Sequence, residues 1–152
     1  MVDEPNTAVD ALVTAYRSTC YHVAAPGQDL QLRVGQYNAG LAKLLREAWV
    51  QGAALLTAWN PGSRLHAREW NEAAQQALER ELAAAGHPCL PARNEPDDFA
   101  TTGRIWIEAS VLALDITLPA AHEVAARYGQ LAFLWIDESA TPQLVITAAG
   151  DA

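Results

Sequence analysis

The sequence predicts a single α/β (α+β) domain in which four helices pack on a mixed β-sheet of about six to seven strands. Apolar residues recur at helical spacing in four stretches, and short apolar or alternating stretches lie between them. Two pairs of the short stretches are joined only by turns, which adds hairpins to the alternation. The 152 residues and 51% hydrophobic content suit one globular domain. We expect it to span residues 1–152, with loose termini at 1–6 and 149–152.

The first half of the chain is predicted as helix, hairpin, helix and strand. Leu12, Val13 and Tyr16 fall on one helical stripe. Residues 30–34 alternate apolar and polar side chains, as a half-buried strand does. Residues 53–59 are apolar on both faces, which is typical of a central strand. The expected elements are a helix at 7–18, strands at 20–24 and 30–34, a helix at 39–50 and a strand at 53–59.

The second half is predicted to begin with the longest helix, in which Trp70, Leu78 and Leu82 belong to the buried stripe. Residues 91–103 hold two prolines, a glycine and three acidic residues, and this composition predicts a loop. Thr117 is a suitable N-cap for the last helix. The expected elements are a helix at 67–85, a short strand at 88–90, a loop at 91–103, a strand at 104–114, a helix between 117 and 129, and strands at 131–136 and 143–147.

Composition excludes several classes of function. The formal net charge is -8 at pH 7, which argues against nucleic-acid binding because such binding depends on lysine and arginine. No apolar run approaches the roughly 20 residues of a membrane span, so no membrane association is expected. The acidic N-terminus lacks a signal-peptide pattern. Cys20 and Cys89 are expected to be free thiols in the reducing cytoplasm.

No cofactor or metal is expected. The histidines show no metal-ligand spacing, and the pair His87 and Cys89 has no matching pair elsewhere. A glycine-rich phosphate loop is absent, so nucleotide binding of that kind is unsupported. The serines lack a nucleophile-elbow motif. The sequence makes no prediction of oligomeric state.

The loop after the predicted central strand is the first candidate site. Ligands of open sheets tend to lie beyond the carboxyl ends of strands, and residues 60–64 occupy that place. Trp59 offers a contact face, and Asn60 an amide that can donate and accept. Ser63 and Arg64 precede a helix start, which would favour an anion. The alternative is that Asn60 and Ser63 only cap the loop and the helix.

Glu108 is the second candidate, because a glutamate inside so apolar a strand is unusual. Strand alternation places Trp106, Glu108 and Ser110 on one face. Burial would raise the pKa of the Glu108 carboxyl unless a cation compensates, and such a group suits a general acid or base. The alternatives are exposure to water or a structural ion pair with one of three arginines, Arg17, Arg33 or Arg64.

Three more residues complete the candidate set. Arg17 and Tyr21 lie at the first helix-to-strand junction, where the arginine fork would suit a carboxylate or phosphate. Gln130 follows Gly129 at the end of the last helix. The alternatives are a surface charge for Arg17 and a cap or exposed residue for Gln130.

Taken in series, these residues resemble one bacterial family, domain-of-unknown-function family 3293. The resemblance covers about residues 12–146, and its most specific part is the run Thr57-Ala58-Trp59-Asn60-Pro61. Its other members are Tyr16 to Tyr21, Ser63, Asn71, Trp106, Glu108, Ser110 and Gly129-Gln130. It implies a small soluble bacterial protein and either a shared site or a shared buried hydrogen-bond network. The chain departs from the family pattern at His66-Ala67, where a helix cap is expected, and at Leu131, where asparagine is expected.

Three functions are consistent with these observations. The first is a small-molecule or anion-binding domain whose site lies at residues 60–64, with Glu108, Ser110 and Arg17 facing it. The second is an enzyme that uses Glu108 as general acid or base on an anionic substrate held by Arg64 or Arg17. The third is a protein-interaction or accessory module without catalysis. The first two require Asn60 and Glu108 to face each other.

Overall fold

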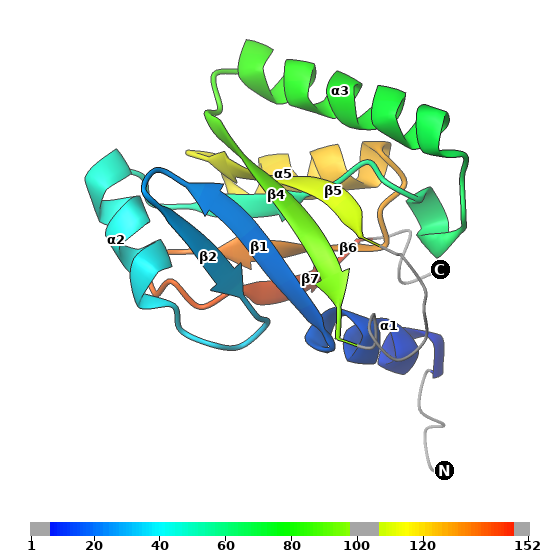
Figure 1. Ribbon diagram of the computed structural model, residues 1–152, viewed down its shortest axis with the longest axis horizontal. Helices are drawn as coiled ribbons and strands as arrows, with labels where there is room; N and C mark the ends of the chain where they lie inside the picture. Colours follow the sequence, from blue (N-terminus) through cyan, green and yellow to red (C-terminus); the bar gives the residue numbers. More distant parts are fainter. Residues whose placement is uncertain (1–6, 98–106, 148–152) are drawn as a thin grey trace.

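The computed structural model describes residues 7–97 and 107–147, and within them four α-helices lie around one seven-stranded sheet (Figure 1). This arrangement confirms the predicted α+β class. The helices are α1 (Thr7–Arg17), α2 (Ala39–Ala48), α3 (Arg68–Ala84) and α5 (Leu118–Arg127). The strands are β1 (Thr19–Ala25), β2 (Gln28–Leu32), β3 (Ala53–Leu56), β4 (Cys89–Pro96), β5 (Glu108–Leu114), β6 (Ala132–Ile136) and β7 (Gln143–Ile146).

The sheet is antiparallel, so the prediction of a mixed sheet is wrong. Its order is β2-β1-β4-β5-β3-β6-β7, and every neighbouring pair is antiparallel. Helix crossovers do link strands of the same direction, as the alternation predicted. However, the linked strands are never neighbours: β5 lies between β3 and β4, β3 lies between β5 and β6, and three strands lie between β2 and β3. The two predicted hairpins, β1–β2 and β6–β7, are confirmed.

The sheet is curled (Figure 1). Each of its faces carries a separate hydrophobic core. On one face, Leu55 and Leu112 pack with Leu45 of α2. On the other, the adjacent Leu56 packs with Leu78 of α3 and with α5. Since successive strand residues point to opposite faces, β3 has to be apolar throughout, and all four of its residues are buried. This confirms the prediction of a central strand covered on both sides.

The prediction of a loop at 91–103 is wrong for its first part, because β4 continues to Pro96 in the middle of the sheet. Its two prolines lie near the ends of β4, where only one of the two neighbouring strands is paired with it. Pro91 pairs with β5 but lies beyond the last partner on β1, and Pro96 pairs with β1 but lies beyond the last partner on β5. Each proline therefore has one strand neighbour, as on a sheet edge, where proline is tolerated. Residues 98–106, which include Trp106, lie outside the described part of the chain.

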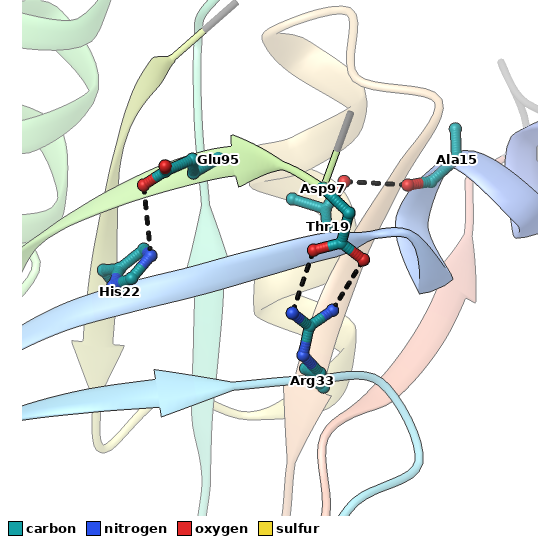
Figure 2. Close-up of polar contacts among 6 residues, drawn as sticks. All are labelled: Ala15, Thr19, His22, Arg33, Glu95 and Asp97. Carbon is teal, nitrogen blue, oxygen red and sulfur yellow. Dashed lines mark hydrogen bonds and ion pairs between the residues drawn. The ribbon is translucent and has the colours of Figure 1, made fainter. Parts of the chain in front are cut away.

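Polar contacts link the ends of β2 and β4 to each other, β1 to β4, and the start of β1 to the end of α1 (Figure 2). Both terminal nitrogens of Arg33 donate to the Asp97 carboxylate at 2.9 Å, and this lowers the pKa of Asp97 below its ordinary value. Thr19 Oγ1 donates to the Ala15 carbonyl at 2.8 Å. Arg33 is thus committed to Asp97 and is not the partner of Glu108 that the sequence allowed. The ion pair is largely exposed and contributes little to stability.

The helices and the cysteines bear on the predicted location. Within residues 7–97 and 107–147, no helix combines the length and apolar character that crossing a membrane requires. Cys20 and Cys89 are both free thiols. The cytoplasmic location stays a prediction.

Candidate functional site

A cavity of about 320 Å³ lies where α1 faces the loop after β3. It is on the same face of the sheet as α2, at the end where β5 begins. Aromatic and polar side chains dominate its wall. The lining residues are Leu12, Ala15, Tyr16, Thr19, Tyr21, Thr57, Trp59, Asn60, Ser63, Asn94, Pro96, Glu108 and Gln130.

Two amides on α3 hold the chain as it leaves β3. Gln75 and Asn71 lie one helical turn apart and are both buried. The Gln75 Oε1 accepts from the backbone N–H of Ala58, and the Asn71 Oδ1 accepts from that of Asn60, each at 2.9 Å. A neighbouring strand would bond alternate N–H groups in the same way. The amides therefore extend the support of β3 beyond the point where sheet pairing stops.

Asn60 is the centre of the site. Its backbone is left-handed, with φ 46° and ψ 60°, a conformation that asparagine tolerates better than most residues. Its Oδ1 accepts from Asn71 Nδ2 at 2.8 Å and from the His66 backbone N–H at 3.0 Å. Its Nδ2 donates to Glu108 Oε1 at 3.1 Å. One side chain thus joins the β3 loop, the start of α3 and the first residue of β5.

The same network holds the segment that leads into α3. Ala67 is the N-cap residue of α3 and provides no side-chain hydrogen bond. Asn71 Nδ2 donates to the His66 carbonyl at 3.3 Å, and Asn60 holds the His66 N–H. The departure from the family pattern at His66-Ala67 therefore leaves the helix start held from the loop.

Glu108 lies half-buried in the cavity wall. Burial raises the pKa of its carboxyl to about 7, and the hydrogen bond from Asn60 opposes this shift. Among the described residues, no cation lies within ion-pair distance of Glu108, and the lining contains no lysine, arginine or histidine. A carboxyl in this state is close to half-protonated at neutral pH and can give or take a proton.

Three adjacent strands place a row of polar side chains across the sheet, which ends at Glu108. Tyr21 of β1 is opposite Asn94 of β4, which is opposite Glu108 of β5. Ser110 is buried behind the row, and its hydroxyl donates to Asn94 Oδ1 at 2.7 Å. Ser110 therefore orients Asn94 and does not line the cavity.

Two tyrosines, one from α1 and one from β1, form part of the cavity wall. The rings of Tyr16 and Tyr21 are stacked, with centroids 6.3 Å apart. The Tyr16 hydroxyl donates to the Ala132 carbonyl at 2.9 Å. Burial raises the pKa of both phenols, and the nearby Glu108 carboxylate raises them further. Both tyrosines are therefore neutral over the range in which Glu108 titrates.

The turn between α5 and β6 closes the remaining side. Gln130 Nε2 donates to the Trp59 carbonyl at 3.2 Å, and the Gly62 N–H donates to the Gly129 carbonyl at 2.8 Å. Gly129 has φ 70°, and a Cβ there would lie 2.8 Å from the Cβ of Pro61. Glycine is thus required at position 129 for two reasons: the positive φ of its backbone and the close approach of Pro61.

We expect Gly129→Ala to destabilise the protein by at least about 1 kcal/mol more than Gly86→Ala. Gly86 is the matched control because its φ is 86° and nothing lies within 4 Å of an added Cβ. Both substitutions strain a left-handed residue, but only the first also pushes Pro61 and its loop. Urea unfolding of the two variants measures the difference, and equal losses would contradict the proposed contact.

The structure divides the predicted site residues into three groups. Six line the cavity: Tyr21, Trp59, Asn60, Ser63, Glu108 and Gln130. Two lie behind it and support its wall, Asn71 and Ser110. Arg17 and Arg64 are exposed and do not line it.

Sequence reasoning missed several lining residues. Tyr16 was assigned to the core because it fits the stripe of α1, and Asn94 was assigned to a loop because two prolines surround it. Thr57 belongs to the motif at the end of β3, but only its position beside Glu108 makes it part of the wall. Polar character within a predicted strand or stripe was the available signal.

Comparison with known proteins identifies a family. The family model described as "Protein of unknown function (DUF3293)" matches residues 56–133, just over half of the chain. The matched segment contains Asn60, Asn71, Asn94, Glu108 and Gln130, whereas the tyrosine wall lies outside it. No curated protein and no solved structure matches this chain.

Proposed function

This chain belongs to the DUF3293 family, and on that premise we propose that it is a small-molecule-binding domain whose ligand occupies the cavity beside Asn60 and Glu108. The observation that carries the proposal is the Glu108 carboxyl, which is half-buried in the cavity wall and, among the described residues, accepts a hydrogen bond only from Asn60. A buried polar group normally has its partners. A ligand in the cavity would provide the further hydrogen-bond partners of the Glu108 carboxyl.

The lining favours an uncharged or cationic ligand over an anion. The described wall has one acidic side chain and no basic one. The nearest expected anion contacts, Arg17 and Arg64, are exposed and outside the lining. Ser63 lies in a 3₁₀ turn (Pro61–Ser63) and not at the first turn of α3, so the anticipated helix N-terminus is also absent from the site.

A second candidate function is catalysis by Glu108 as general acid or base. The observation that favours it is the pKa of about 7 for this carboxyl, since an acid-base group works best when its pKa is close to the working pH. The cavity is small for a ligand site, whose usual volume is about 300–1,000 Å³, so the substrate would be small.

The interaction-module alternative has less support. Its surface would use the exposed tryptophans, and Trp49 and Trp70 are the most exposed tryptophans among the described residues. They lie at the end of α2 and in α3, and Trp70 stacks on His66 of its own chain. A concave polar cavity is a better indication of a small ligand than two separated rings.

We expect Ala15→Trp to abolish ligand binding while the protein stays folded. Ala15 is exposed on α1 and lines the cavity, so a larger side chain there would fill the opening. Thr14→Trp is the matched control, because Thr14 is exposed on the same helix and does not line the cavity.

The measurement is a thermal-shift screen against small metabolites, followed by calorimetry of any ligand that stabilises the wild type. Binding that Ala15→Trp removes and Thr14→Trp retains would support the site. A ligand that binds both variants equally lies elsewhere, and the absence of any stabilising ligand would contradict the binding function.

A further inference from the structure

The charge of the missing ligand can be inferred from what surrounds Glu108. One oxygen, Oε1, accepts from Asn60 Nδ2 at 3.1 Å, and no described residue donates to the other. A neutral amide is a weak counterpart for a buried carboxylate, whose burial usually requires a cation. The site therefore has an acceptor and a negative charge available, and none of its described residues supplies the positive charge that would match them.

The rest of the wall suits a positive charge. Three aromatic residues, Tyr16, Tyr21 and Trp59, line the same cavity as Glu108. Aromatic faces attract cations through their quadrupole, and cages of such rings bind organic ammonium groups. The formal net charge of -8 also draws cations towards the protein and repels anions.

We propose that the cavity binds a small organic ammonium ion, with the ammonium group against Glu108 and its apolar part against the aromatic wall. This inference rests on the proposed binding function and specifies the ligand class. Asn60 holds one carboxylate oxygen in place, so the other is left to accept from the ligand. Because the cavity volume is about 320 Å³, the ligand is a small amine and not a peptide.

Ammonium binding requires the ionised carboxylate, so affinity follows the titration of Glu108. Among residues 7–97 and 107–147, the titratable groups that face it are Tyr16 from α1 and Tyr21 from β1, and both phenols have raised pKa values. The described lining from β3, β4, the β3 loop and the α5–β6 turn adds no other titratable side chain. Since the pKa of Glu108 is about 7, we expect affinity to rise about tenfold between pH 6 and pH 8.

The test uses three probes of matched shape: phenethylamine, 2-phenylethanol and 3-phenylpropionate. Calorimetry or NMR titration is carried out at pH 6 and pH 8 on the wild type and on Glu108→Gln, whose folding is checked by thermal unfolding. We expect the amine to bind at least tenfold more tightly than the other two at pH 8. Glu108→Gln should lose this preference and the pH dependence. Tetramethylammonium and putrescine extend the cation arm.

The outcomes separate this inference from the function on which it rests. If the alcohol or the carboxylate binds as well as the amine, and Ala15→Trp blocks that binding, the site exists but the ammonium assignment is wrong. If amine affinity is unchanged by pH and by Glu108→Gln, the assignment is also wrong. A pKa near 4.5 for Glu108 in the free protein would show that water or a cation of the chain already compensates the carboxylate, and would overturn it. If no probe and no metabolite binds, both proposals fail.

Discussion

Asn71→Ala is expected to be one of the two most destabilising substitutions at the site, with a loss of about 3–5 kcal/mol in the free energy of unfolding. Asn71 is 2% exposed and makes three hydrogen bonds, two with Asn60 and one with the His66 carbonyl. Alanine would leave the buried N–H of Asn60 without an acceptor. It would also remove the hydrogen bond that holds the His66 carbonyl just before α3.

The control is Gln76→Ala on the exposed face of the same helix, which should change stability by no more than about 0.5 kcal/mol. Urea unfolding measures both variants. A second measurement distinguishes a local from a general effect. If Asn60 no longer donates to Glu108, the pKa of Glu108 should rise above about 7, as carboxyl NMR can detect. A loss below about 1 kcal/mol would mean that the amide pair does not hold the loop.

Much of the fold could be predicted because each helix and most strands have a local signature. The stripe of α2, the Thr117 cap of α5 and the doubly apolar β3 depend only on neighbouring residues, and the structure has each of them. Strand order and pairing are not local. Nothing near β3 or β4 in sequence indicates that β5 lies between them. Likewise, Pro91 and Pro96 suggest a loop until the offset of the two neighbouring strands is known.

The candidate site was predictable to the extent that it is made of unusual residues. Glu108 and Ser110 stand out in an apolar strand, and Asn60 stands out at a strand end before proline. The structure brings Asn60 and Glu108 into direct contact. Arg17 and Arg64 were chosen for their chemistry alone, and charge gives no information about which way a surface side chain points. Asn94 and Tyr16 were missed because their role depends on tertiary neighbours.

The pH dependence of stability provides the second large effect, and Glu108→Gln isolates it. The folded pKa of Glu108 is raised from 4.5 to about 7 by burial, so the native state holds the proton more tightly than the unfolded chain. Stability from this group is complete below about pH 4.5 and is lost as pH rises through about 7. Between pH 5 and pH 8 the loss amounts to about 2–3 kcal/mol.

Glutamine cannot ionise, and its Oε1 can still accept from Asn60 Nδ2. The quantity to compare is the free energy of unfolding of Glu108→Gln minus that of wild type. We therefore expect this difference to be about 2–3 kcal/mol larger at pH 8 than at pH 5. The matched control is Glu69→Gln, an exposed position on α3, for which the difference from wild type should stay constant. Urea unfolding at pH 5, 6, 7 and 8 gives the four comparisons. If the difference for Glu108→Gln is also constant, the carboxyl ionises as freely in the folded protein as in water. Added amine should reverse the trend, because an ammonium ion against Glu108 would stabilise the folded protein most where the carboxylate is ionised.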